Sequence, residues 1–91
     1  MKKRFYYINH RKTILYCDIY YNNEKFPIYS FSRNLVSFEV ESTCCTNYVD
    51  ITQHDLELHA FMRLSHQYIV NPDSMAGEKI EEMFELENLN I

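Results

Sequence analysis

The sequence contains one glycine and two prolines among its 91 residues, and this scarcity excludes several kinds of site. Glycine supplies positive φ angles and close backbone approach, so glycine-rich phosphate loops and dinucleotide-binding turns cannot be built here. Long apolar runs are missing too, and none approaches the length of a membrane span. The basic cluster near the start is followed by only four apolar residues, so we expect no signal peptide and no membrane partner.

Cysteine is also sparse. The three cysteines are an odd number, so they cannot all pair within one chain. Cys44 and Cys45 are neighbours, and a disulfide between adjacent residues is strained. Reduced thiols are the simplest interpretation, and they predict a cytoplasmic protein, in the host cytoplasm if the chain is viral.

Signatures of metal binding and catalysis are absent from the sequence. A zinc site needs about four converging nitrogen or sulfur ligands, and neither the cysteines nor the histidines have a suitable spacing. No nucleophile elbow or HExxH motif is present. Glu57, in the first turn of a predicted helix, is expected to complement the helix N-terminus rather than to act as a base. We therefore expect no enzyme, no catalytic residue, no metal site and no cofactor.

What the chain does have is hydrophobic and aromatic material for one core: 46% of its residues are hydrophobic, with eight Tyr and six Phe. This composition and length predict a single domain that spans residues 1–91. The first half reads as β structure. Alternating or aromatic-rich runs between polar turns predict strands at Arg4–Ile8, Thr13–Tyr21, Phe26–Phe31 and Leu35–Glu41. Tyr48–Ile51 is either a short fifth strand or an extended lead-in.

The second half is predicted to be helical. Thr52-Gln53-His54-Asp55 resembles a capping box, and an apolar face follows at helical spacing: Leu56, Ala60, Phe61, Leu64 and Tyr68. Asn71-Pro72-Asp73-Ser74 predicts a break, with Pro72 opening a last helix that runs to about Leu89. That helix turns its apolar residues inward, namely Ala76, Ile80, Met83 and Phe84. The predicted fold class is α+β: an antiparallel meander of four to five strands, followed by two C-terminal α-helices packed on one face.

Charge is divided along the chain. Residues 1–33 hold seven basic and two acidic side chains, a net +5, whereas residues 34–91 hold two basic and eleven acidic ones, a net −9. The two parts account for the net charge of −4. We expect folding to keep the cationic and anionic segments apart as two poles, whose fields select partners by sign.

The last predicted helix carries an acidic face. It consists of Glu78, Glu81, Glu82 and Glu85. Such a row can mimic the phosphates of a nucleic acid or dock on a basic groove, although a solvated helix face that keeps a protein soluble has the same pattern. Glutamates near a helix C-terminus oppose the helix dipole, which favours an interaction role at Glu85.

The start of the chain is basic and aromatic. Cations hold phosphates and aromatic rings stack on unpaired bases, so this segment is a candidate nucleic-acid site. The candidate residues are Lys2, Lys3, Arg4, Tyr6, Arg11 and Lys12. The other interpretation is an edge strand whose rings enter the core and whose cations discourage edge pairing. The net negative charge favours this second interpretation.

These features predict a small non-catalytic interaction or inhibitor protein. Its partner would be a host or bacterial-defence protein that handles nucleic acid, bound through the acidic face. Abundant Phe, Tyr, Met, Ile, Asn and Lys are residues of AT-rich codons, which suggests a phage, viral or mobile-element origin. One alternative is an RNA- or single-stranded-nucleic-acid-binding module that uses the basic aromatic strand. A further alternative is a small homodimeric structural protein in which the basic end of one copy meets the acidic end of another.

Overall fold

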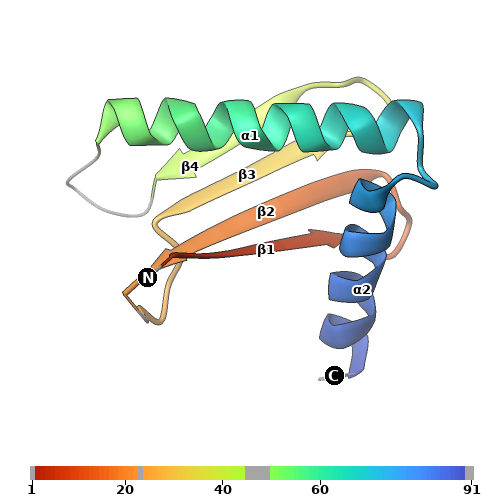
Figure 1. Cartoon of the computed structure of the whole chain (residues 1–91), viewed down its shortest axis with the longest axis horizontal. Coiled ribbons are helices and arrows are strands. Elements are labelled where there is room, and N and C mark those ends of the chain that lie inside the picture. Colours follow the sequence, from red (N-terminus) through yellow and green to blue (C-terminus); the bar gives the residue numbers. More distant parts are fainter. Residues whose placement is uncertain (1, 23, 45–49, 90–91) are drawn as a thin grey trace.

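A computed structural model describes residues 2–22, 24–44 and 50–89, without the side chains of residues 82 and 84–89. The described chain folds as β1 (Lys2–Ile8), β2 (Ile14–Tyr21), β3 (Tyr29–Asn34), β4 (Val40–Cys44), α1 (Ile51–Val70) and α2 (Met75–Leu89). The four strands form one antiparallel sheet in chain order, and the helices follow (Figure 1). The predicted α+β class and meander are therefore confirmed, with four strands.

Strand alternation gives the sheet two different faces. On the inner face, residues from β1, β2 and β3 are buried and pack with one residue from each helix: Tyr6, Ile8, Leu15, Cys17, Ile19, Tyr29, Phe31, Phe61 and Ile80. The ring of Phe61 in α1 stacks on Phe31 at 5.8 Å between centroids. Both helices thus pack on one face of the sheet, as predicted. The outer face carries the intervening residues of each strand.

The hairpin between β1 and β2 is held by Asn9. Its side-chain carbonyl accepts hydrogen bonds from the backbone N–H groups of Thr13 and Ile14. Lys12 takes a positive φ of 57° in this turn, and Asn22 takes 53° after β2. Asparagine tolerates this left-handed conformation better than most residues, which is why the polar stretch after β2 was a good turn prediction.

The predicted bounds of the last two strands are wrong. The third strand begins at Tyr29 rather than at Phe26, and the Phe26 side chain is 76% exposed. The fourth begins at Val40 rather than at Leu35. The cause is Asn34, whose side chain accepts hydrogen bonds from Val36 N and Ser37 N and so starts a turn.

Helix α1 begins one residue before the predicted capping box. Asp50 is the N-cap, and its side chain accepts a hydrogen bond from the Gln53 backbone N–H, so the prediction of Thr52 as the cap is wrong. Residues 48 and 49 of the possible fifth strand lie outside the described residues, and Ile51 is the first residue of α1. The buried line of α1 is Glu57, Phe61 and Ser65, whereas Leu56 is 61% exposed.

The break between the helices lies where it was predicted, but α2 starts three residues later than Pro72. Asn71 closes α1, residues 72 and 73 form a turn, and α2 begins at Met75. Ala76 and Ile80 are buried as predicted, Met83 is half-buried, and the side chain of Phe84 lies outside the described residues. Gly77 is required here, because a Cβ atom on it would lie 1.7 Å from the carbonyl oxygen of Pro72.

Candidate functional site

The cationic start of the chain is partly neutralised inside the molecule. Lys2 and Arg4 point to the inner side of β1 and meet Glu57 of α1. The Glu57 carboxylate accepts hydrogen bonds from Arg4 Nε at 2.8 Å, from Arg4 Nη2 at 2.9 Å and from Lys2 Nζ at 2.5 Å. Gln53 donates a fourth at 3.1 Å. Lys2 and Arg4 therefore lock β1 to α1, and the predicted separation into two poles does not hold for these two side chains.

Glu57 is a structural carboxylate rather than a helix-dipole partner. Its side chain is only 2% exposed. Burial alone would raise the pKa of Glu57, but the hydrogen bonds from Arg4 and Lys2 outweigh burial and hold it below its ordinary value. The expectation that Glu57 serves the helix N-terminus is therefore wrong. Glu57 lies four residues before Phe61, and residues at this spacing share one face of a helix. This spacing was the sequence signal that the Glu57 carboxylate faces inward.

A second polar contact joins α1 to the sheet. Arg33 of β3 is 9% exposed and donates a hydrogen bond to Ser65 Oγ at 2.9 Å. Its guanidinium also lies 5.8 Å from the centre of the Phe38 ring. Within the described ranges no carboxylate lies within ion-pair distance of Arg33. Polar contacts at Glu57 and Ser65 thus hold α1 on either side of the apolar Phe61, and the Tyr29 hydroxyl also donates to the carbonyl of the N-cap Asp50 at 3.3 Å.

The six residues predicted for nucleic-acid binding are divided between the two sides of the sheet. Lys2, Arg4 and Tyr6 face inward. Tyr6 is 4% exposed, and burial raises its pKa to about 12; Lys79 of α2 lies 5.0 Å from its ring centre. Lys3 on the outer side of β1, and Arg11 and Lys12 in the turn, are exposed.

The outer face of β1 and β2 carries four aromatic rings, and two of them, Tyr16 and Tyr20, lie outside the basic aromatic segment predicted from the sequence. Tyr7 and Tyr16 are opposite each other across the two strands, and their rings stack at 4.9 Å. Phe5, which is 39% exposed, meets the ring of Tyr20 edge-on at 5.5 Å. The period-two alternation of the two strands is the signal that places these four rings together.

A hollow of about 380 Å³ lies on this outer face beside the rings. Its lining includes Tyr16, Tyr20, Ser30, Ser32, Glu41 and Thr43. Asp18 lies within it, and the Asp18 carboxylate accepts hydrogen bonds from the Tyr7 hydroxyl at 3.0 Å and from the Ser30 hydroxyl at 2.9 Å. The hollow therefore combines aromatic surface with several hydroxyl groups.

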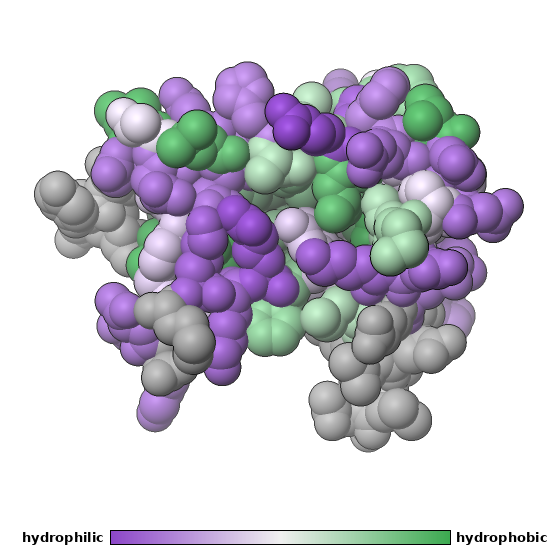
Figure 2. Space-filling view, viewed as in Figure 1, coloured by the Kyte–Doolittle hydropathy of each residue, from purple (hydrophilic) through white to green (hydrophobic). Residues whose placement is uncertain are grey.

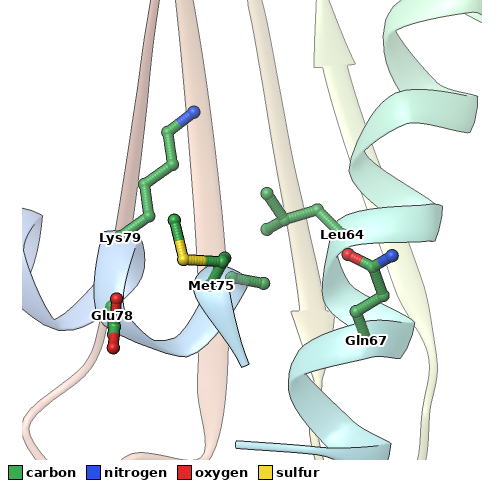
Figure 3. Close-up of a pocket in the computed structure, with 6 residues that line it drawn as sticks. Leu64, Gln67, Met75, Glu78 and Lys79 are labelled. Carbon is green, nitrogen blue, oxygen red and sulfur yellow. The ribbon is translucent and has the colours of Figure 1, made fainter. Parts of the chain in front are cut away.

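On the helix side, a groove of about 440 Å³ separates α1 from α2. Leu64 and Gln67 line it from α1, and Met75, Ala76, Glu78 and Lys79 line it from α2. Figure 3 shows the Leu64 side chain directed from α1 toward α2, where Met75 and Lys79 lie across from it. Met75 is 80% exposed, so the groove offers apolar surface to solvent with one charge of each sign beside it.

The predicted acidic face meets this groove at Glu78, which is one of its lining residues. Glu78 and Glu81 are exposed on α2. Glu82 and Glu85 also belong to α2, and their side chains lie outside the described residues. Elsewhere on the helix side, α1 exposes the apolar residues Ile51, Leu56 and Val70. Figure 2 shows separate green apolar areas along its upper edge, with purple hydrophilic areas between them. Scattered residues of this kind are ordinary on protein surfaces.

The described residues contain no group of three or more His, Cys, Asp or Glu side chains that could hold a metal ion. Of the helices described, none is long and apolar enough to cross a membrane. Comparison with protein-family models, with curated proteins and with solved structures finds no match to this chain. The functional conclusions therefore depend on the chemistry of its own surfaces.

Proposed function

We propose that this chain is a small non-catalytic interaction protein that binds a partner protein at the groove between α1 and α2. The observation that carries the proposal is an apolar groove bordered by the acidic helix α2. Leu64 and Met75 offer apolar contacts, and Glu78 lines the groove with a negative charge. Glu81 is exposed on the same helix, and Lys79 lies over the Tyr6 ring. A partner segment with an apolar anchor flanked by Lys or Arg matches this arrangement.

The proposed partner is a protein that handles nucleic acid in a host cell or a bacterial defence system, and the chain would block its basic surface. Proteins of this class present basic surfaces to phosphates, which is the chemistry that an acidic helix face recognises. The residue composition supports an origin in a phage, virus or mobile element. The proposed setting is the cytoplasm, because Cys17 and Cys44 are free thiols.

A capture experiment with charge variants tests this proposal. The immobilised chain is incubated with host lysate with and without nuclease, and bound proteins are identified by mass spectrometry. Some bound protein should still be captured after nuclease treatment. The amount of that protein should be lower with the Glu78→Gln/Glu81→Gln variant and with the Met75→Asp variant. Glu41→Gln, on the other side of the sheet, is the matched control. Capture that is unchanged in both groove variants would show that the partner does not use this groove.

A further inference from the structure

The β1–β2 hairpin brings aromatic rings and cations together on the side of the sheet away from the helices. Phe5, Tyr7, Tyr16 and Tyr20 lie on this outer face, as two ring pairs one beside the other. Helices α1 and α2 both pack on the opposite face, so neither of them covers these rings (Figure 1). Phe5 is exposed and the other three rings are half-buried. Aromatic rings on the open face of a four-stranded sheet are a known platform for stacking two or three unpaired bases.

Cations stand at both ends of this ring surface. Lys3, opposite Tyr20 in the register, lies at one end of β1, and Arg11 and Lys12 lie in the turn at the other end. All three are exposed, and none of them belongs to the Glu57 cluster, which consists of Glu57, Lys2, Arg4 and Gln53. Seven strand residues at roughly 3.3 Å each separate the two ends by about 20 Å. A short single strand can therefore place phosphates at both ends while its bases lie over the rings.

Two carboxylates, Asp18 and Glu41, lie on this face of the sheet and line the hollow beside the rings. Asp18 is the only acidic residue of the β1–β2 hairpin, and its carboxylate already accepts hydrogen bonds from Tyr7 and Ser30. Glu41 lies on β4, at the opposite edge of the sheet from β1. The sheet is thus basic along β1 and acidic along β4, which directs a phosphate backbone to the β1 side.

From this placement we infer that the outer face of the β1–β2 hairpin binds single-stranded RNA or DNA. Phe5 and Tyr20 stack bases, and Lys3, Arg11 and Lys12 contact phosphates. The inference goes beyond the proposed function, because it concerns the opposite face of the sheet from the α1–α2 groove. It also differs from the sequence-based site, since Lys2, Arg4 and Tyr6 contribute to the core side instead.

The test is fluorescence anisotropy of short labelled oligo(U) and oligo(dT), titrated with the purified chain over a series of salt concentrations. Binding should be strongest at low salt. With three phosphate contacts the logarithm of the binding constant should fall with the logarithm of the salt concentration with a slope of about −2. Lys3→Gln should reduce that slope by about 0.7. Tyr20→Leu should weaken binding about tenfold without changing the slope, because it removes a stacking ring and no charge.

Three controls make the outcome decisive. Lys79→Gln removes a cation on the helix side and should leave binding unchanged. Glu78→Gln/Glu81→Gln should also bind the oligonucleotides as the wild type does. This variant therefore separates a failure of the proposed protein-binding groove from a failure of the proposed nucleic-acid site. Circular dichroism melting of each variant shows whether it folds.

Three results would overturn the inference. The first is the absence of any anisotropy change at low salt, and the second is binding that Tyr20→Leu and Lys3→Gln leave intact. The third is a concentration-dependent dimer in light scattering that Tyr20→Leu disperses, in a chain that binds no oligonucleotide. That result would assign the ring surface to a second copy of the chain.

Discussion

Replacing Glu57 by glutamine tests how the first helix is held on the sheet. The substitution keeps the shape of the side chain and removes its negative charge. In the wild type the carboxylate accepts three hydrogen bonds from two cations, Lys2 and Arg4, while it is almost completely buried. The single carbonyl oxygen of glutamine can accept only some of these hydrogen bonds. Its NH2 group is a donor and would face the N–H donors of Lys2 and Arg4.

The size of the effect follows from the exposure of the two cations. Breaking a fully buried ion pair costs about 3–5 kcal/mol, because it leaves an unpaired charge without water. Lys2 and Arg4 retain 32% and 36% exposure, so water can hydrate them again after the change. We therefore expect a loss of about 2 kcal/mol for Glu57→Gln. In a domain of this length such a loss lowers Tm by about 10 °C.

Thermal and urea unfolding followed by circular dichroism at neutral pH measures this loss. Glu81→Gln is the matched control, since it makes the same chemical change at an exposed helical position and should stay within about 0.5 kcal/mol of the wild type. If Glu57→Gln is as stable as Glu81→Gln, then the cluster does not hold α1 on the sheet and the reasoning fails.

The difference in unfolding free energy between the wild type and Glu57→Gln should depend on pH with a defined sign. The pKa of Glu57 is lowered in the folded state from its ordinary value of 4.5. A lowered pKa gives stability that is fully present above the ordinary value and is lost as the pH falls through the folded value. The stability difference between wild type and Glu57→Gln should therefore persist at neutral pH and shrink in acid. A difference that stays constant well below pH 4.5 would contradict the charge-based explanation.

Two further predictions concern packing around the core. Gly77→Ala should lower the unfolding free energy by about 1–3 kcal/mol in urea titration, because the new methyl group collides with the Pro72 carbonyl; a gain of about 1 kcal/mol, as helix propensity alone gives, would contradict the close approach. In a Cys45→Ser variant, Cys44 should react quickly with a thiol reagent and Cys17 should react only on unfolding, because Cys17 is buried and its pKa is raised to about 12. Fast reaction of both thiols in the folded protein would refute this difference.

The fold class could be predicted from the sequence because its strongest patterns are local. The apolar run from Ile14 to Tyr21 and the Asn71–Ser74 break are set by neighbouring residues, and the structure has β2 and the helix break at these places. The predicted start of β4 was wrong because the side chain of Asn34 makes turn hydrogen bonds that no alternation pattern shows.

The candidate sites were less accessible to sequence reasoning. Alternation places Lys2, Arg4 and Tyr6 on one side of β1. The division of charge along the chain did not show that this side faces α1, because the tertiary packing of the helix decides it. The same alternation sends Lys3 and Phe5 outward, so the basic aromatic segment supplies residues to both faces. The groove between α1 and α2 depends on how the two helices diverge after the turn, which no local pattern specifies.

Hydroxyl-radical footprinting with residue-level mass spectrometry compares the two faces of the sheet, one covered by both helices and the other open for binding. We predict that Phe5 and Tyr20 are oxidised in the folded chain while Tyr6, Phe31 and Phe61 are protected, and that oligo(U) protects Phe5 and Tyr20. Protection of Phe5 and Tyr20 to the same degree as Tyr6 in the free chain at high dilution would show that the outer face is already covered, and would contradict this prediction.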